Sequence, residues 1–297
     1  MIPLFIIGGL IQRSIGNVIM DDIGQVWQSA AARSEALYDR RQGHAKLLLL
    51  RGVHSGYDGR MVLQGIDSVI AEHADAAFCV ITGDLAHVGH PDAYRQLSEQ
   101  CARLPMPVHL ILGNHDSRTN FRERFPQVPV DSNGFVQYEQ AIGRSRGLFL
   151  DTNEPGTHCG VFCEQRANWL SQRLAEDDSP VLLFMHHPPF HLGIPVADRI
   201  GLVDNEWLLA ALKGHEHRVK HLFFGHIHRP ISGTWRGIPF STLRGTNHQV
   251  ALHLGESEDI PGSFEPPQYA VVLLDDDSVI VHLHDFLDRS ERFWLGA

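Results

Sequence analysis

Apolar runs of strand length alternate with helix-like segments from Lys46 onward. The runs read KLLLL, AAFCVIT, PVHLIL, GLFL, PVLLFM and VKHLFF, and most of them are followed by glycine, aspartate or histidine. Between the runs, apolar residues recur at helical spacing over residues 61–73, 91–104, 163–175 and 205–213. Strands that alternate with helices predict an α/β fold, in which helices cover the faces of a sheet.

The amino-terminal segment and the last third of the chain follow other patterns. Residues 1–43 contain a helix-compatible stretch but no strand-like alternation, so we expect an atypical segment outside the core. The last third contains short strand-like segments separated by turns, at residues 233–238, 240–243, 249–254, 269–275 and 278–284. These segments predict a second sheet built from hairpins. The core domain is expected to span residues 44–290.

Polar residues follow four of the predicted strands. The motifs are Gly83-Asp84, Gly113-Asn114-His115-Asp116, His186-His187-Pro188-Pro189 and Gly225-His226-Ile227-His228. Ligands of open α/β sheets bind at the carboxyl ends of the strands. Each motif alone also fits a turn or a helix cap, but the four together indicate a metal site. Carboxylate, amide oxygen and imidazole form a ligand set for Fe, Mn, Zn or Co, and the set is large enough for two ions.

Composition and charge exclude several other classes of protein. The chain has 297 residues and a formal net charge of −10, which argues against binding to a nucleic-acid backbone. No run of about 18 apolar residues indicates a membrane span, and the four cysteines are too few and too irregular for a disulfide framework. Neither a P-loop nor a Gly-x-Ser-x-Gly elbow is present. A cytoplasmic protein is therefore expected.

The four motifs resemble the signature of the calcineurin-like metallophosphoesterase superfamily, over roughly Lys46 to His253. That signature reads Asp-x-His, Gly-Asp, Gly-Asn-His-Asp/Glu, His and Gly-His-x-His. Residues 184–189 and 241–250, and the helix opening Pro91-Asp92-Ala93-Tyr94, are similar to class III cyclic nucleotide phosphodiesterases and bacterial glycerophosphodiesterases. The resemblance implies a four-layer α/β/β/α sandwich around two divalent metal ions. It also implies a small-molecule phosphodiester substrate and a homodimer.

The resemblance assigns a role to each motif residue. Asp84 would bridge the two ions, and His228 would join it at the first ion. The second ion would be completed by Asn114, His186 and His226, with His186 preferred over His187 because the family usually uses the first histidine of the pair. His115 would lie at the phosphate and assist the leaving oxygen.

The first motif of the signature is not intact in this chain. Either Gln42-Gly43-His44 occupies its place, with glutamine instead of aspartate, or Gly52-Val53-His54 does, with glycine instead of aspartate. The stretch that follows favours His44 as the ligand, and His54 is the alternative. In both cases the first ion loses a carboxylate, which predicts a weaker first site.

The leading hypothesis is hydrolysis of a phosphodiester, of the cyclic nucleotide or glycerophosphodiester type, by a metal-bound hydroxide. One alternative is a phosphomonoesterase or nucleotidase that uses the same metal site. Another alternative is a degenerate metal-binding protein with little turnover, because the aspartate of the first motif is missing.

Overall fold

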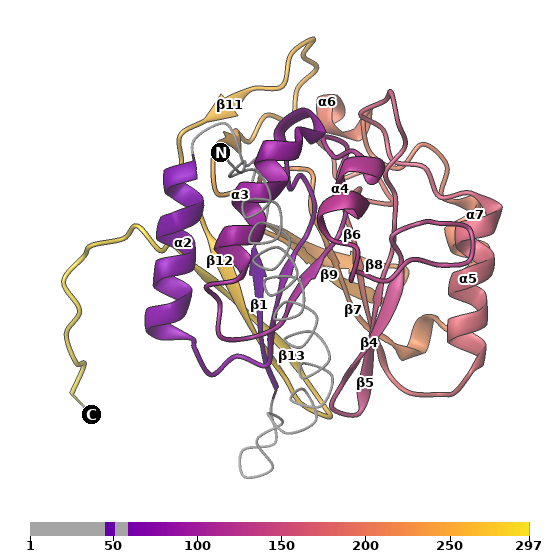
Figure 1. Cartoon of the computed structure of the whole chain (residues 1–297), viewed down its shortest axis with the longest axis horizontal. Helices are drawn as coiled ribbons and strands as arrows, with labels where there is room; N and C mark the ends of the chain where they lie inside the picture. Colours follow the sequence, from indigo (N-terminus) through magenta and orange to yellow (C-terminus); the bar gives the residue numbers. More distant parts are fainter. Residues whose placement is uncertain (1–44, 51–58, 297) are drawn as a thin grey trace, which may run out of the picture.

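The computed structural model describes residues 45–50 and 59–296. The segment 1–43 and both candidate histidines of the first motif, His44 and His54, lie outside the described residues. Two sheets form the centre of the molecule (Figure 1). The first sheet combines strands from near both ends of the described chain, whereas the second sheet is built from strands that are consecutive in the sequence.

The first sheet has the strand order β13-β12-β1-β2-β3. Its strands are β1 Ala45–Leu50, β2 Phe78–Ile81, β3 Val108–Leu110, β12 Tyr269–Leu274 and β13 Val279–His284. The second sheet has the order β4-β5-β6-β7-β9-β8. Its strands are β4 Tyr138–Ile142, β5 Ser145–Phe149, β6 Val181–Met185, β7 Val219–Phe224, β8 Ile231–Trp235 and β9 Ile238–Thr242. The short strands β10 Gln249–Val250 and β11 Gly262–Ser263 form a separate hairpin.

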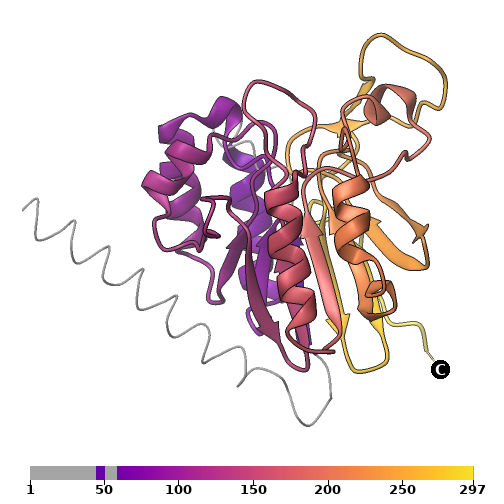
Figure 2. The same ribbon diagram turned by 90° about the vertical axis from the view of Figure 1, so that its right-hand side faces the viewer.

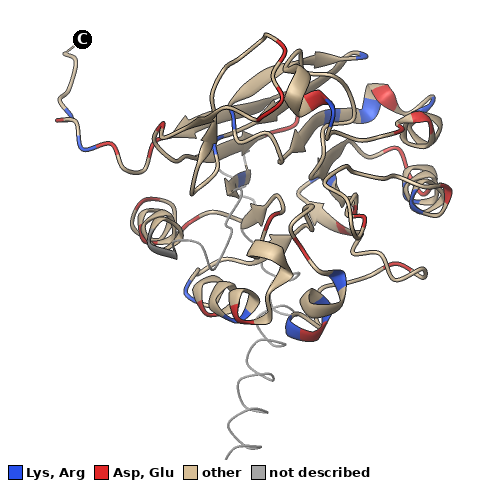
Figure 3. Ribbon diagram, turned by 90° about the horizontal axis from the view of Figure 1, so that it is seen from above, with Lys and Arg blue, Asp and Glu red and all other residues tan. Residues whose placement is uncertain are grey.

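Helices cover the outer faces of both sheets. The first sheet carries α2 Gly59–Glu72 and α3 Pro91–Cys101, and the second carries α5 Glu164–Ala175 and α7 Glu206–Leu212 (Figure 2). The remaining helices are α4 Arg118–Arg124, α6 Pro195–Asp198 and the 3-10 turns η1 His87–Gly89 and η2 Glu216–Arg218. The layers therefore run α/β/β/α, as predicted. Lys and Arg lie among Asp and Glu on the peripheral helices and loops (Figure 3).

Strand β6 shows why its sequence is apolar at every position. Side chains alternate between the two faces of a strand. Leu182 and Phe184 point into the layer between the sheets, whereas Val181, Leu183 and Met185 pack against α5 and α7. Both faces are covered, so the run VLLFM has no polar position.

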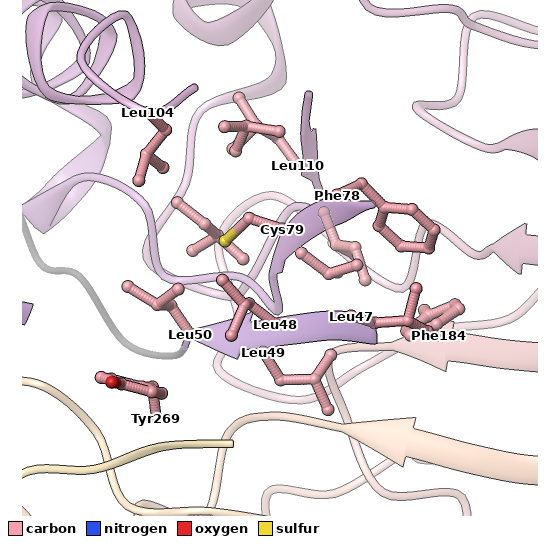
Figure 4. Packing of buried hydrophobic residues seen from close by; sticks show 14 of the residues in the cluster. Leu47, Leu48, Leu49, Leu50, Phe78, Cys79, Leu104, Leu110, Phe184 and Tyr269 are labelled. Atoms are coloured by element: carbon pink, nitrogen blue, oxygen red, sulfur yellow. The ribbon is translucent and has the colours of Figure 1, made fainter. Parts of the chain in front are cut away.

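A stack of aromatic rings on the inner face of the second sheet packs against the first sheet. The ring centroids of Tyr138 and Phe149 lie 4.7 Å apart, those of Phe149 and Phe184 4.7 Å apart, and those of Phe184 and Phe223 5.3 Å apart. These rings belong to the same buried cluster as Leu47 of the first sheet, part of which is shown in Figure 4. The contact fixes β6 and β7, which lead into two of the predicted metal-binding motifs, against the first sheet.

Two predictions about the last third of the chain are wrong. The hairpin β8–β9 turns at Arg236-Gly237, which have φ of 51° and 82°, and not near Pro239. Arginine stands where a two-residue turn usually has asparagine or aspartate, so residues 236–237 carry no clear turn signal. The strands of the last third also do not join in one second sheet, and only β10 and β11 stand apart as a two-stranded hairpin. β8–β9 extends the second sheet, and β12–β13 extends the first.

His109 of β3 is buried between the sheets, where its ring packs against Phe78, Tyr138 and Phe149. Burial lowers the pKa of this imidazole from 6.5 to about 3. The unfolded chain therefore binds a proton near pH 6.5, whereas the folded chain binds it only near pH 3. The resulting stabilisation is complete above pH 6.5 and is lost as the pH falls toward 3.

We expect His109 alone to lower the free energy of unfolding by about 2 kcal/mol between pH 7 and pH 5. The variant His109→Leu has no group that titrates at this position, so its stability should fall correspondingly less over the same range. Urea unfolding of both proteins at pH 7, 6 and 5 measures the difference. An equal fall in the free energy of unfolding of both proteins would contradict the lowered pKa of His109.

Candidate metal centre

The four predicted motifs meet at one edge of the two sheets. Parallel strands β2 and β3 lead into the loops that carry Asp84 and Asn114, and parallel strands β6 and β7 lead into His186 and into His226 with His228. Carboxyl ends of parallel strands lie at the same edge, and the packing of the sheets brings the two edges together. The loops touch directly, because Nδ1 of His186 lies 2.8 Å from the carbonyl oxygen of Thr82.

Five of the six side chains predicted as ligands converge at this edge, and the sixth, His44 or alternatively His54, lies outside the described residues. Asn114 Oδ1 lies 3.1 Å from His186 Nε2 and 2.9 Å from His226 Nδ1. The carboxylate of Asp84 lies 3.3 Å from His186 Nε2 through Oδ1 and 3.9 Å from His228 Nε2 through Oδ2. Asp84 and the three histidines are buried. The two sheets thus bring oxygen and nitrogen donors together from four separate loops.

Hydrogen bonds to the backbone fix the tautomers of two histidine rings. His186 Nδ1 lies 2.8 Å from Thr82 O, and His228 Nδ1 lies 2.7 Å from His248 O. A carbonyl oxygen can only accept, so Nδ1 carries the hydrogen in both rings. In the neutral rings, Nε2 then presents its lone pair toward Asp84. Metal-binding histidines are commonly oriented in this way by a backbone carbonyl.

This donor set fits a divalent metal ion. The lone pair of His186 Nε2 faces two oxygen atoms that also carry lone pairs, Asp84 Oδ1 at 3.3 Å and Asn114 Oδ1 at 3.1 Å. A cation among them would satisfy all three atoms. Imidazole, carboxylate and amide oxygen together match the preferences of Fe, Mn, Zn and Co.

The backbone at the site is held in an uncommon conformation. Asp84, His226 and His228 have φ of 54°, 72° and 49°, in the left-handed region that non-glycine residues rarely adopt. Each such residue costs about 1–3 kcal/mol, and such residues cluster at functional sites. The surrounding hydrogen bonds and packing must therefore hold these three ligands in place.

Two glycines make room for the ligands. A Cβ atom at Gly83 would lie 2.2 Å from His186 Nδ1, and one at Gly113 would lie 2.3 Å from Asp84 Oδ1. Gly83 also has φ of 95°, which favours glycine. The glycines that precede Asp84 and Asn114 in the sequence are thus required by close approach.

The variant Gly83→Ala should be destabilised more than Gly214→Ala. Gly214 has a similar φ of 84°, but a Cβ atom there would meet nothing within 4 Å. We expect a loss of about 1–2 kcal/mol from backbone strain in both variants, and about 1–3 kcal/mol more from the collision in Gly83→Ala. Urea unfolding measures both. Equal losses would contradict the close packing at Gly83.

A cavity of about 340 Å³ opens beside the ligands. It is lined by Asp84, Asn114, His115, His158, Ile200, His226, His228, His248, Gln249, Val250, Ile260 and Gly262. Val250 and Ile260 of the hairpin β10–β11, together with Ile200 two residues after α6, contribute apolar side chains to this lining. Burial lowers the pKa of His115 at this cavity, and the negative charge of Asp84 acts in the opposite direction.

His187 lies close to the site but has other partners. Nitrogen atoms of His186, His187 and His226 lie within 4.8 Å of one another, so the three could in principle hold an ion. However, His187 Nδ1 lies 2.8 Å from Thr152 Oγ1, and its Nε2 lies 3.2 Å from His158 O. With both nitrogens engaged in the protein, His187 supports the loop at residue 158, whereas Nε2 of His186 faces the oxygen atoms of Asp84 and Asn114.

Sequence reasoning missed several residues of the cavity. His158 lies in the loop between β5 and α5, and its Nδ1 is 2.9 Å from Asn114 Nδ2. An amide nitrogen only donates, so this contact turns Asn114 Oδ1 toward His186 and His226. Ile200 and Ile260 also line the cavity. A single histidine or isoleucine in a loop gives no signal in the sequence.

The sequence matches a known family model and named proteins. The model for the calcineurin-like phosphoesterase family matches residues 53–230. A probable cyclic nucleotide phosphodiesterase from Rhodopseudomonas palustris is 46% identical over 230 residues, which cover 75% of this chain and 83% of the relative. A probable glycerophosphodiester phosphodiesterase from Arcobacter nitrofigilis is 32% identical, over 63% of this chain and 70% of the relative.

A solved structure with the same fold is a dimetal phosphatase from Danio rerio. Its TM-score is 0.62 and its identity is 19%, over 82% of this chain and 97% of that chain. At this identity the likeness concerns the fold, and it agrees with the order of layers described above. Among the described residues, no helix has both the length and the apolar character needed to cross a membrane.

Proposed function

Because the chain belongs to the calcineurin-like phosphoesterase family, we propose that it hydrolyses a small phosphodiester of the cyclic nucleotide or glycerophosphodiester type. Family membership confirms the enzyme class predicted from the sequence, a metal-dependent phosphoric ester hydrolase. The observation that carries the proposal is the convergence of Asp84, Asn114, His186, His226 and His228 beside a cavity. The type of substrate is supported by the names of the two relatives.

Two divalent ions of the Fe, Mn, Zn or Co type are part of the proposal. One would be held by Asn114, His186 and His226, with Asp84 shared between the ions. The other would be held by Asp84, His228 and the first-motif histidine, His44 or alternatively His54. When bound, such ions lower the pKa of a coordinated water and neutralise charge on the phosphoryl oxygens.

The side chains of the cavity suit the substrate and its leaving group. His115 lines the cavity, and its lowered pKa favours a neutral ring at pH 7, which can donate a hydrogen bond to the leaving oxygen. Ile200, Val250 and Ile260 form apolar lining that keeps water from the rest of the substrate. A volume of about 340 Å³ is at the lower end for small-molecule pockets and suits a small substrate better than a polymer.

Paired assays with bis(p-nitrophenyl) phosphate and p-nitrophenyl phosphate test the proposal on the metal-loaded protein. We expect the diester to be hydrolysed faster than the monoester. A strong preference for the monoester would overturn the proposal in favour of a phosphomonoesterase or nucleotidase. Cyclic AMP and a glycerophosphodiester then separate the two classes of diester.

The missing aspartate of the first motif supports a second candidate function, metal binding with little turnover. Metal content per chain, measured by elemental analysis after loading with Mn²⁺, separates the two candidates. A content of about two Mn²⁺ ions per chain together with diesterase activity would support the hydrolase. A content of about one Mn²⁺ ion per chain with negligible turnover would support a metal-binding protein with little activity. A cytoplasmic location and a homodimer remain predictions.

Restoring the aspartate tests which residue occupies the altered position. Either Gln42→Asp or Gly52→Asp should strengthen the first metal site about ten-fold or more, since ligand charge helps to set the affinity for a cation. Mn²⁺ titration followed by the diester assay measures the effect. If neither variant gains affinity or activity, the absent carboxylate is not what limits the site.

A further inference from the structure

Asp116 ends the motif that carries Asn114, and its role is not explained by metal binding. The side chain is 8% exposed and accepts four hydrogen bonds. Its Oδ2 accepts from the backbone N–H groups of Leu85 at 3.1 Å and Gly113 at 2.8 Å. Its Oδ1 accepts from the N–H of Ala86 at 3.0 Å and from the hydroxyl of Tyr94 at 2.9 Å.

These bonds tie together the two loops that carry Asp84 and Asn114. Leu85 and Ala86 follow Asp84 directly, and Gly113 precedes Asn114. The carboxylate of Asp116 therefore fixes both ligands relative to each other from behind. Because it bonds the two residues that follow Asp84, it also helps to hold Asp84 at its φ of 54°.

Tyr94 connects this carboxylate to helix α3. The side chain is fully buried, and its ring packs against Phe121 and Phe125. Its hydroxyl donates to Asp116 and accepts from the N–H of Ser117 at 2.9 Å. The hydroxyl thus holds the end of the Asn114 loop as well as the carboxylate that joins the loops.

We propose that Asp116 and Tyr94 are positioning residues that set the geometry of Asp84 and Asn114, and so the affinity of the chain for divalent metal ions. Neither is among the described residues that line the 340 Å³ cavity, so both act through the ligand loops. The inference rests on the metal site of the proposed function. Loss of groups that orient metal ligands typically lowers metal affinity 10- to 100-fold.

The decisive variant is Tyr94→Phe, with Tyr138→Phe as its matched control. Tyr138 is also buried, and its hydroxyl lies 3.0 Å from both the N–H and the carbonyl oxygen of Leu110. Each variant loses one buried hydroxyl with a donor and an acceptor partner and keeps its ring. The two should therefore lower the Tm of the metal-free protein by similar amounts.

Mn²⁺ affinity is measured by equilibrium dialysis, together with the Tm of the metal-free and metal-loaded proteins. We expect Tyr94→Phe to raise the Kd for Mn²⁺ 10- to 100-fold and to shrink the rise in Tm caused by the metal. Tyr138→Phe should change neither quantity. Equal Kd values in the two variants would overturn the proposal, because the Tyr94 hydroxyl would then be merely structural.

The variant Asp116→Asn removes the charge and one acceptor oxygen while keeping the size of the side chain. The amide nitrogen of the asparagine would replace one carboxylate oxygen and would face the two donors that this oxygen accepts from. Two donors cannot bond each other, so the affinity for Mn²⁺ should fall at least as far as in Tyr94→Phe. If this variant does not fold, the comparison of Tyr94→Phe with Tyr138→Phe decides. Wild-type protein that binds Mn²⁺ but hydrolyses no diester would refute the proposed function alone, whereas one that binds no Mn²⁺ would refute both.

Discussion

Replacement of Asp84 by alanine is expected to abolish diester hydrolysis, with a loss of about 1,000-fold or more. Asp84 is the only one of the five converging side chains that carries a carboxylate, and it faces both His186 and His228. In the proposed arrangement with two ions, both ions would lose a negatively charged ligand without it. The loss corresponds to roughly 4 kcal/mol of transition-state stabilisation. Assays with bis(p-nitrophenyl) phosphate and elemental analysis of the same samples measure activity and metal content together.

Asp131→Asn is a suitable control for Asp84→Ala. Asp131 is also a buried aspartate, and its side chain accepts hydrogen bonds from the N–H groups of Asn133 and Phe135 and from Gln137. The control should lower stability but retain metal and activity. Full turnover by Asp84→Ala would refute the assignment of the metal centre.

Phe184→Ala is expected to lower the free energy of unfolding by about 3–5 kcal/mol. Phe184 is fully buried, and its ring stacks between Phe149 and Phe223 in the layer between the sheets. Truncation removes the centre of that stack and leaves a cavity that rigid strands cannot close. Because His186 lies two residues further along the chain, metal affinity should fall as well.

Urea unfolding of the metal-free protein measures this loss, and Phe264→Ala is the control. Phe264 is 100% exposed, so its truncation should change the stability by less than about 0.5 kcal/mol. Similar values for the two variants would mean that the stacked rings do not carry the packing between the sheets.

The apolar runs predicted an α/β fold with helices on the sheet faces, and the residues that follow the runs predicted that polar side chains meet at the strand ends. The four layers were predicted only through the resemblance to the family. Strands such as β6 have no polar position because both of their faces are covered, which makes them conspicuous in a sequence. Glycines beside Asp84 and Asn114 were equally informative, since close approach at Gly83 and Gly113 leaves no space for a side chain.

Features that depend on pairing between distant segments could not be predicted. The sequence predicts strands in the last third but not which sheet each strand joins. That choice depends on which sheet still has an edge strand without a partner. The bonds from Asp116 to Leu85 and to Tyr94 join residues 31 and 22 positions apart, and no local pattern marks them. His158 likewise becomes meaningful only when its loop lies over Asn114.

The position of β1 between β2 and β12 has a consequence for the order in which the protein is assembled. β1 is the first strand of the described chain, yet Leu48 pairs with Val271 in β12, near the other end. During synthesis the strands β4 to β9 are available for their sheet first, while β1 keeps one edge open until β12 emerges. Contacts over such sequence distances slow folding, and an open apolar edge is a template for association with other chains. The sheet that begins first is thus closed last, and the sheet that leads into the loops of Asp84 and Asn114 is completed only after β12 has been synthesised.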